Sequence, residues 1–474
     1  MEHYSFSEQL DRAVDFFNSI GRDETIKIVS HLDADGICAG SIMIAALNRL
    51  GRKYAISIVP QLQEKLISEL ASERYNAYIF TDLGSGQIGP ISSMMRGSKV
   101  LVLDHHGIKD KRALQEEDVM HVNPHLAGLD GSTEISGAGV VFEFARRLDK
   151  ENTDLAHLAV IGAIGDCQEN RGFKGYNSQI LKTAEMMGVI RTHKGLCVFG
   201  SQSKPLHKLL EYSFEPYIPG VSGSESGAVE FLRSININPK QGNSWKKLVH
   251  LTEKEMERLV AGIVMRRKNE DKPDDVIGNI YILPGEDEGP LRDAREFSTL
   301  LNSCGRMGKA SIGIGACLGD QKMKRKAIKS LVDYRRELVS ALRWFDANKN
   351  AKDITIDKGF MIINAKYSIL PTMIGTVASI ISRSNEIKEG TIVMAMARLE
   401  QKQTKISFRM AGRDRDGCPD LRAVAAKVAG HVNGQSGGHV NAAGAIIDTS
   451  REEESIMFSL QLLSSLAMEE KIVS

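Results

Sequence analysis

The first 170 residues alternate short apolar runs with longer segments of helical pattern. Four runs are apolar enough along their whole length to be buried strands, at residues 25–29, 54–59, 77–80 and 99–103. Helical spacing or nearly continuous apolar sequence predicts helices at residues 5–20, 37–47, 62–74, 136–148 and 154–164. Strands that alternate with helices in this way predict an α/β fold with a doubly wound, mostly parallel sheet.

Polar clusters follow three of these strands directly. The first strand runs into SHLDADG (residues 30–36), the third into TDLG (81–84) and the fourth into DHHG (104–107). The apolar helix at 154–164 ends at Asp166, where an unpaired carboxylate would be costly without a cation or a donor. The carboxyl ends of parallel strands meet at one edge of a sheet, so we expect the clusters to gather there.

Imidazole and carboxylate groups together are the ligands that Mn²⁺ or Mg²⁺ takes in proteins. Each cluster also has a simpler interpretation. Asp33 or Asp35 could cap the helix that follows, residues 104–107 could form a solvated turn, and Asp166 could end its helix in water. The presence of all four clusters at one edge favours a metal site.

The second half of the chain has a weaker pattern up to about residue 350. Glycine-, serine- and proline-rich stretches at 216–226 and 236–243 are typical of loops, and residues 269–275 form an acidic run. A basic helix at 322–336 is most simply a solvated face, although it could also track the phosphates of a single strand.

A second α/β unit follows from about residue 357. Its predicted strands are 360–363, 391–397 and 405–410, and its predicted helices are 372–384, 421–432 and 452–469. We therefore expect three parts, at residues 1–170, 171–350 and 351–474.

Composition excludes several classes of protein. With 61 basic and 60 acidic residues the formal charge is +1, which argues against a polybasic, non-specific nucleic-acid binder. The six cysteines are scattered without a CxxC pair, as is typical of reduced intracellular thiols. No apolar run is long enough to span a bilayer and the N-terminus lacks the pattern of a signal peptide, so we expect a soluble cytoplasmic protein without a membrane partner.

The motifs SHLDADG, FTDLG, LDHHG and AIGDCQ resemble the four N-terminal motifs of the DHH phosphoesterase superfamily. Near the C-terminus, GGHVNAAG (residues 437–444) resembles the glycine-glycine-histidine motif of the DHH-associated domain. The five motifs stand in the order of that family. Within it, the chain most resembles the archaeal RecJ-like exonucleases, also called GINS-associated nucleases.

The resemblance implies a site for two divalent cations, which activate a shared water and hold the attacking and leaving oxygens. The first ion would be held by His31 and Asp33, and the second by Asp35, His105 and Asp166. Asp82 would bridge the two ions, and Asp104 and His106 would orient ligands or contact the phosphate. The mixed nitrogen and oxygen ligands favour Mn²⁺ over Mg²⁺.

The resemblance also implies substrate-binding residues in the second unit. Ser407 and Arg409 match a serine-x-arginine element that holds a terminal 5′-phosphate, and Gly437 and Gly438 let a nucleotide backbone approach closely. His439 would donate to a phosphate oxygen during catalysis. Arg409 could instead be an ordinary surface residue of a strand, and the two glycines a simple turn.

The implied activity is 5′-to-3′ exonuclease action on single-stranded DNA and possibly on RNA, in archaeal replication or repair with the GINS complex. A cleft between the two family domains would admit a single strand and exclude a duplex. The chain ends at Ser474, without the OB-fold domain that follows the glycine motif in bacterial RecJ, so the preference for DNA or RNA stays open. The alternatives are a phosphodiesterase for short oligonucleotides or cyclic dinucleotides, a pyrophosphatase, and a GINS-binding scaffold without activity.

Overall fold

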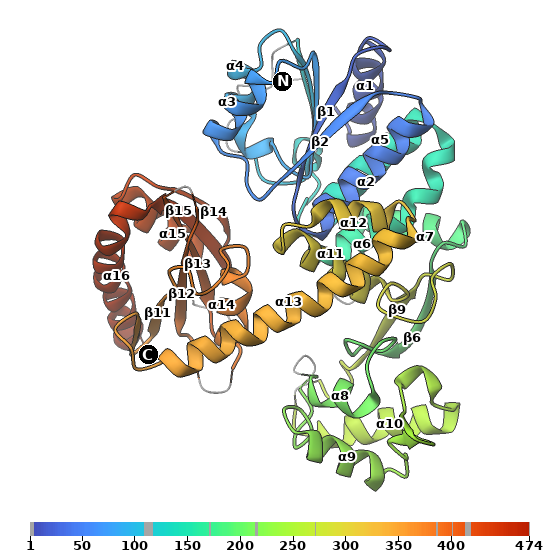
Figure 1. Cartoon of the computed structure of the whole chain (residues 1–474), viewed down its shortest axis with the longest axis vertical. Coiled ribbons are helices and arrows are strands. Elements are labelled where there is room, and N and C mark those ends of the chain that lie inside the picture. Colours follow the sequence, from blue (N-terminus) through green and yellow to red (C-terminus); the bar gives the residue numbers. More distant parts are fainter. Residues whose placement is uncertain are drawn as a thin grey trace. The chain divides into compact units, whose positions relative to one another are not determined.

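The computed structural model describes residues 4–108, 117–169, 172–213, 217–270, 272–384, 387–400, 402–412 and 419–473. The side chains of His439 and of residues 467–473 lie outside this description, as does all of Cys418. The chain forms two compact units, residues 1–331 and 332–474, each described separately here (Figure 1).

The first unit contains a five-stranded, wholly parallel sheet with strand order β2-β1-β3-β4-β5. Its strands are β1 (Ile26–His31), β2 (Tyr54–Val59), β3 (Ala77–Thr81), β4 (Lys99–Leu103) and β5 (Val119–Val122). The predicted parallel sheet and four of its strands are confirmed. The fifth strand was not predicted, because four residues that include His121 are too short and too polar to stand out.

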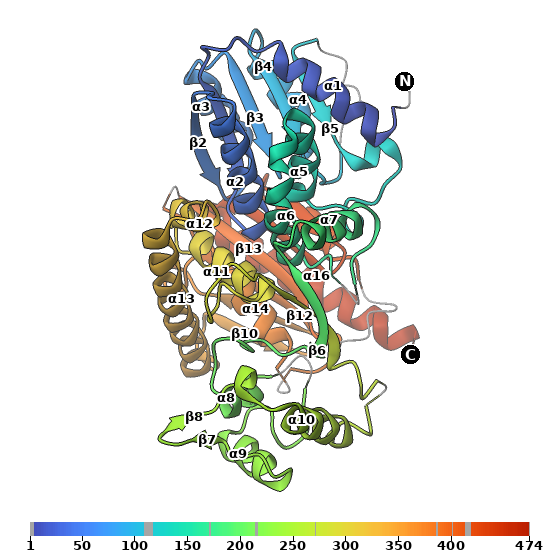
Figure 2. The same cartoon turned by 90° about the vertical axis from the view of Figure 1, so that its right-hand side faces the viewer.

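Helices cover both faces of this sheet, as expected for a doubly wound fold. They are α1 (Phe6–Asn18), α2 (Ala34–Arg49), α3 (Glu64–Ser72), α4 (Ile88–Met94), α5 (Gly137–Leu148) and α6 (Ala156–Gly165). Figure 2 labels these helices around the sheet. Alternate strand residues point to opposite faces, so Ile28 packs in one core with α1, α2 and α5, while Val29 packs in another with α3 and α4. The two cores hold the strand ends, and hence the polar clusters, in place.

The described residues between 172 and 331 form helices and strands for which the sequence gave only a weak pattern. The helices are α7 (Gly175–Met186), α8 (Leu206–Glu211), α9 (Glu225–Ser234), α10 (Glu253–Arg266), α11 (Ala294–Arg306) and α12 (Ala310–Cys317). The strands pair antiparallel, β6 (Arg191–Leu196) with β9 (Ile277–Ile282) and β7 (Lys240–Gln241) with β8 (Ser244–Trp245). The loop interpretation of 216–226 and 236–243 was therefore wrong at Glu225 and Ser226, which begin α9, and at the short strand β7.

The basic helix is longer than predicted. α13 (Gln321–Asn348) begins in the first unit and ends in the second. Within the described ranges, no helix combines the length and the apolar content that a bilayer-spanning segment needs.

The second unit is an α/β domain with a mixed six-stranded sheet of order β10-β11-β12-β13-β15-β14. Its strands are β10 (Ile354–Asp357), β11 (Phe360–Asn364), β12 (Ile392–Arg398), β13 (Gln403–Met410), β14 (Gln435–His439) and β15 (Ala442–Asp448). Its helices are α14 (Ile374–Ser382), α15 (Leu421–His431) and α16 (Glu452–Val473). The smaller C-terminal α/β domain is confirmed, with strands β10, β14 and β15 added to the predicted set.

Candidate active site

The turn after β1 positions the first two polar residues. Asp33 is the N-cap of α2, and its Oδ1 accepts a hydrogen bond from the Gly36 N–H at 3.0 Å. The other oxygen, Oδ2, lies 2.9 Å from His31 Nδ1. The capping interpretation of Asp33 is therefore correct, and it leaves one carboxylate oxygen facing the histidine.

Asp35 lies in α2, but its side chain is held by backbone N–H groups of α5. Its two oxygens accept from the N–H groups of Gly137 at 2.7 Å and Ala138 at 3.0 Å, in the first turn of α5. The side chain is buried, and its Oδ2 lies 3.9 Å from His105 Nε2. Burial raises the pKa of Asp35, and the neighbouring carboxylate of Asp82 raises this pKa further.

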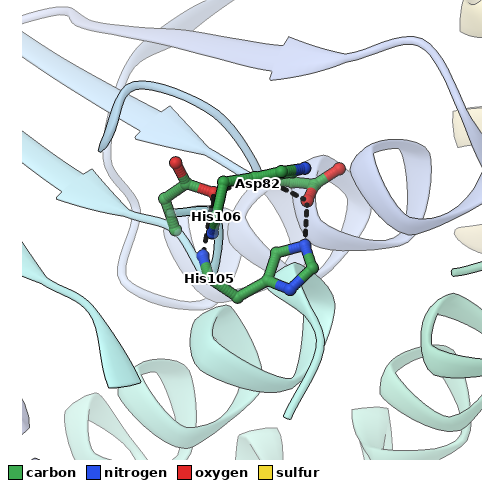
Figure 3. Close-up of side chains that lie close together, drawn as sticks. Asp82, His105 and His106 are labelled. Atoms are coloured by element: carbon green, nitrogen blue, oxygen red, sulfur yellow. Dashed lines mark hydrogen bonds and ion pairs between the residues drawn. The ribbon is translucent and has the colours of Figure 1, made fainter. Parts of the chain in front are cut away.

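Asp82 lies at the centre of the cluster, directly after β3 (Figure 3). Its backbone φ is +59°, a left-handed conformation that aspartate adopts only where the surroundings impose it. Oδ1 lies 3.3 Å from His105 Nε2 and 3.9 Å from His106 Nδ1, and Oδ2 lies 3.6 Å from His31 Nδ1. One carboxylate thus faces three imidazoles from two strand ends.

Asp104 organises the end of β4. Its oxygens accept from the N–H groups of Ser85, His105 and His106 and from His106 Nδ1 at 2.8–3.2 Å. Burial alone would raise the pKa of Asp104, but the His106 imidazole and these hydrogen bonds hold it well below its usual value. Burial would likewise lower the pKa of His106, and the Asp104 carboxylate outweighs this and raises it. The side chain of His106 remains 43% exposed, so its Nε2 edge is available to a ligand.

Asp166 completes the site from the end of α6. Its Oδ2 lies 3.8 Å from His105 Nε2 and accepts a hydrogen bond from Gln168 Nε2 at 2.7 Å. The structure thus brings all eight predicted residues of the first unit together. Their donor atoms form three overlapping groups, each within 4.8 Å: Asp82, Asp104, His105 and His106; His31, Asp33 and Asp82; and Asp35, His105 and Asp166.

The unpaired donor atoms of this cluster fit a divalent metal. Among the described residues, His31 Nδ1, His105 Nε2 and both oxygens of Asp82 are buried without a hydrogen-bond partner. A buried polar atom in that state costs free energy unless a ligand satisfies it. Carboxylate oxygens and imidazole nitrogens are ligands for Mn²⁺ and Mg²⁺, so the residues present match such a cation.

Several positioning residues were missed from the sequence. Gln168 Nε2 donates to the Gly131 carbonyl at 2.8 Å, and the same carbonyl lies 2.7 Å from His105 Nδ1. Asn177 in turn donates to Gln168 Oε1 at 2.7 Å. Gln168 stands within the AIGDCQ motif, which was the only signal for it.

The region 171–350 also supplies part of the metal-site framework. Asn302 Oδ1 of α11 accepts from the Ala34 N–H at 3.1 Å, which fixes the turn after β1. A Cβ atom at Gly305 would lie 1.7 Å from the Leu32 carbonyl oxygen, so only glycine allows this approach. The sequence LLNSCGRMG contained both residues but no pattern that linked them to Leu32.

In the second unit, Ser407 and Arg409 lie on one face of β13. A Cβ atom at Gly375, in the first turn of α14, would lie 3.2 Å from Ser407 Oγ and 3.1 Å from Arg409 Nη2. Arg409 Nε donates to Ser379 Oγ at 2.8 Å, and Nη1 donates to the Phe408 carbonyl at 2.7 Å. The hydroxyl and the guanidinium therefore meet at the N-terminal end of α14.

The two glycines of the glycine motif lie in strand β14 rather than in a turn. Gly437 pairs with Gly444 of β15, which pairs with Ser407, and the backbone of His439 is aligned with Ala442 and Arg409 in the same way. Gly438 has φ +129°, and a Cβ atom there would lie 2.5 Å from the Ala442 carbonyl oxygen. The prediction that the two glycines form a turn was wrong. Across the sheet, Gly437 is in register with Ser407 and the backbone of His439 is in register with Arg409, in both cases through β15.

The fold, the Asp/His cluster and the matching domain models are those of a DHH-type metal-dependent phosphoesterase. Residues 25–164 match the model of the DHH family, N-terminal domain, and residues 359–467 match that of the DHHA1 domain. Residues 198–280, within the part that the sequence left undefined, match a DHH-CID domain.

Among curated proteins, the chain is 29% identical over 436 residues to an uncharacterized protein of Methanocaldococcus jannaschii, covering 90% of this chain and 91% of that one. It is 26% identical over 188 residues to the single-stranded-DNA-specific exonuclease RecJ of Bacillus subtilis, covering 36% of this chain and 23% of the relative.

Solved structures show the same fold. RecJ from Thermus thermophilus in complex with Mn²⁺ has a TM-score of 0.58 at 16% identity, over 97% of this chain and 55% of that one. CDC45 from Entamoeba histolytica has a TM-score of 0.64 at 11% identity, over 97% and 98%. The chain spans about half the length of the Thermus RecJ.

Proposed function

We propose that the chain is a RecJ-like exonuclease that hydrolyses phosphodiester bonds of single-stranded DNA, and of RNA, from the 5′ end. The observation that carries the proposal is the position of Asp82, whose two unpaired oxygens lie between the His31–Asp33 pair and the group Asp35, His105 and Asp166.

Two divalent cations, Mn²⁺ in preference to Mg²⁺, are the proposed cofactors. We assign His31 and Asp33 to one ion, Asp35, His105 and Asp166 to the other, and Asp82 to both. When bound, the ions would activate a water molecule and stabilise the charge on the phosphate. The imidazoles in this cluster support the choice of Mn²⁺, and the Thermus RecJ has been crystallised with either ion.

The protein's own groups then orient and neutralise the phosphate. Asp104 holds His106 through Nδ1, and this hydrogen bond favours the protonated imidazole because the carboxylate raises its pKa. The partly exposed His106 can therefore donate to a phosphate oxygen. We assign His439 a similar donor role from its motif, alongside Asp82 and His106 as the catalytic residues.

The second unit would bind the end of the strand. The Ser407 hydroxyl and the Arg409 guanidinium both lie beside Gly375, in the first turn of α14, and together these two donors can hold an anion. A terminal 5′-phosphate fits this set of donors. A site that binds a chain end restricts cleavage to that end, which is the reason for proposing an exonuclease, with Gly437 and Gly438 admitting the backbone of the next nucleotides.

The biological setting is proposed from the resemblance. The relative in B. subtilis is specific for single-stranded DNA, which supports a single-stranded substrate. We propose action in archaeal replication or repair together with the GINS complex, in the cytoplasm, and a division into parts at 1–170, 171–350 and 351–474. Co-purification with GINS tests the partner independently of activity.

The test of the proposed activity uses single strands of DNA and RNA labelled at either end, with Mn²⁺. We expect mononucleotides to be released progressively from the 5′ end, and Asp82→Asn to abolish this release. Asp346→Asn changes an exposed carboxylate outside the site and serves as the control. Internal cuts, or cleavage of dinucleotides but not of 20-nucleotide strands, would contradict the proposal and favour a phosphodiesterase for short substrates.

A further inference from the structure

Three aromatic rings lie exposed in the part of the first unit that contains α8 and the β7–β8 hairpin. Figure 2 shows these elements in green. The exposed fractions are 38% for Phe199, 53% for Tyr212 and 41% for Trp245. Rings of this size usually contribute to a core, and several exposed rings in one region indicate a contact surface. None of the site residues described above lies in this region.

Lysine side chains lie over each of these rings. Lys204 Nζ is 5.1 Å from the ring centre of Phe199 and 5.0 Å from that of Tyr212. Lys208 Nζ lies 5.8 Å from the Tyr212 ring centre, and Lys240 Nζ lies 4.9 Å from that of Trp245. Each of these three exposed rings therefore has at least one lysine ammonium group over it.

The two halves of this surface are joined by direct contacts. The buried His207 ring of α8 lies 3.9 Å from the Trp245 ring, centre to centre, and holds the indole in place. The Leu206 N–H donates to the Lys246 carbonyl at 2.7 Å, beside the bridge between Pro205 and Lys247. The rings are thus presented on a fixed scaffold, which reduces the entropy lost when a ligand binds.

The two segments that form this surface are rich in lysine, and carboxylates of neighbouring elements neutralise part of the lysine charge. Residues 198–212 and 238–250 contain five lysines and one acidic residue, Glu211. Three of these lysines also contact carboxylates: Lys208 with Glu211 and Glu225, Lys246 with Glu255, and Lys247 with Glu288. Lys204 and Lys240 lie over the rings, and Lys204 also interacts electrostatically with Glu296.

We propose that this ring-and-lysine surface, made of Phe199, Lys204, Lys208, Tyr212, Lys240 and Trp245, is a second binding site for single-stranded nucleic acid. Exposed bases replace the lysine ammonium groups on the ring faces and stack there, and the displaced lysines contact the phosphates between the bases. A duplex hides its base faces, and an acidic peptide has none, so a single strand uses both features of the surface. The inference rests on the proposed function: it assigns the strand downstream of the cleaved end a place to bind.

The test measures the fluorescence of Trp245 directly. The chain has two tryptophans, Trp245 and Trp344, so Trp344→Phe leaves Trp245 as the only one. In this variant, with Asp82→Asn to prevent cleavage, a 12-nucleotide deoxythymidine strand should quench the fluorescence, and an abasic strand of equal length should not. Absence of quenching, or equal quenching by both strands, would overturn the proposal.

Affinity measurements supply a second readout that does not depend on Trp245. Tyr212→Ala should weaken binding of the same strand about tenfold, as expected for the loss of one stacked base. Lys240→Ala should lower the slope of log affinity against log salt by about 0.7, as expected for one phosphate contact. The control is Tyr367→Ala, which removes a ring that is 71% exposed in the second unit. Unchanged affinity in Tyr212→Ala would overturn the proposal.

These outcomes separate the two proposals. If the strand quenches Trp245 and binds tightly but the chain with Asp82 intact cleaves nothing, the exonuclease proposal is rejected and the binding-surface proposal is supported. If the chain cleaves from the 5′ end but the strand does not quench Trp245, the binding-surface proposal is rejected and the exonuclease proposal is supported. If both proposals hold, Tyr212→Ala should raise KM for 20-nucleotide strands and leave the cleavage of dinucleotides unchanged.

Discussion

Gly137 and Asp82 are in such close contact that a Cβ atom at Gly137 would lie 2.3 Å from Asp82 Oδ1. The first residue of α5 therefore limits where the central carboxylate of the site can lie. The backbone N–H group of Gly137 also donates to Asp35 Oδ2 at 2.7 Å. One glycine therefore positions two carboxylates that follow different strands.

We expect Gly137→Ala to displace Asp82 and to lower the proposed nuclease activity at least 100-fold. The methyl group also overpacks the site, which should cost about 1–3 kcal/mol of folding stability. The measurements are kcat/KM on a labelled strand and the free energy of unfolding in urea. The control is Gly430→Ala in α15, where an added Cβ atom meets nothing within 4 Å and should stabilise the helix by about 1 kcal/mol. Wild-type activity in a folded Gly137→Ala protein would contradict this role.

Metal binding should release protons. Burial by itself lowers the pKa of His31 and His105, but the surrounding carboxylates outweigh it and raise both well above the usual value. Raised values mean that these imidazoles are protonated near neutral pH without metal, and a cation binds only the neutral form. We therefore expect Mn²⁺ affinity to increase with pH.

Calorimetric titration in two buffers of different ionisation enthalpy counts the protons released. The observed heat should differ between the buffers, and the difference should shrink in His105→Gln. Identical heats in both buffers would show that the site is already deprotonated.

The polar strand ends were predictable because each followed its own apolar strand directly. His31, Asp82 and His105 needed only the rule that parallel strands end at one edge of the sheet. The partners that fix them were not predictable, because they are distant in sequence. Asp35 and Gly137 are 102 residues apart, and Ala34 and Asn302 are 268 apart. Local patterns carry no information on such contacts.

The same reason explains the region 171–350. Helices α9 and α10 bury only a few residues each, so their apolar pattern is weak. Glycine and serine therefore dominated the pattern at 216–226, although Ser224 caps α9 by accepting from the Gly227 N–H. In the glycine motif, the pair Gly437–Gly438 was compatible with a turn or a strand. Only the pairing of β14 with β15 decided between them.

Arg409→Ala should remove the preference for 5′-phosphorylated strands. A hydrogen bond to a charged group contributes about 1.5–3 kcal/mol, so KM for a 5′-phosphorylated strand should rise roughly 10- to 100-fold while KM for a 5′-hydroxyl strand changes little. Mn²⁺ binding should be unchanged, because Arg409 lies in the second unit. Arg451→Ala, in the same unit and paired with Glu454, is the control. Equal losses on both kinds of end would reject the phosphate-binding role.

Gln168 should act as a positioning residue of the metal site. Its amide bridges Asp166 Oδ2 and the Gly131 carbonyl that also contacts His105, so Gln168→Ala leaves two ligands without their support. We expect Mn²⁺ affinity to fall about 10- to 100-fold, as is typical of partners behind metal ligands. Added Mn²⁺ should restore much of the activity. If saturating Mn²⁺ restores nothing, the amide contributes to catalysis in another way.

Glu452 should make the stability of the second unit depend on pH. Its carboxylate accepts from Asn364 at 2.7 Å, from Arg398 at 2.9 and 3.0 Å and from Thr404 at 2.9 Å. Burial would raise the pKa of Glu452, but these donors outweigh burial and lower it below the usual 4.5. A lowered pKa in the folded state stabilises the protein above about pH 4.5, and this stabilisation is lost as the pH falls further. Glu452→Gln should therefore cost about 2 kcal/mol at pH 7 and progressively less below pH 4.5 in urea unfolding. Glu453→Gln, which changes an exposed neighbour, should have no such dependence, and a constant difference between wild type and Glu452→Gln from pH 7 to pH 4 would rule out the assigned shift.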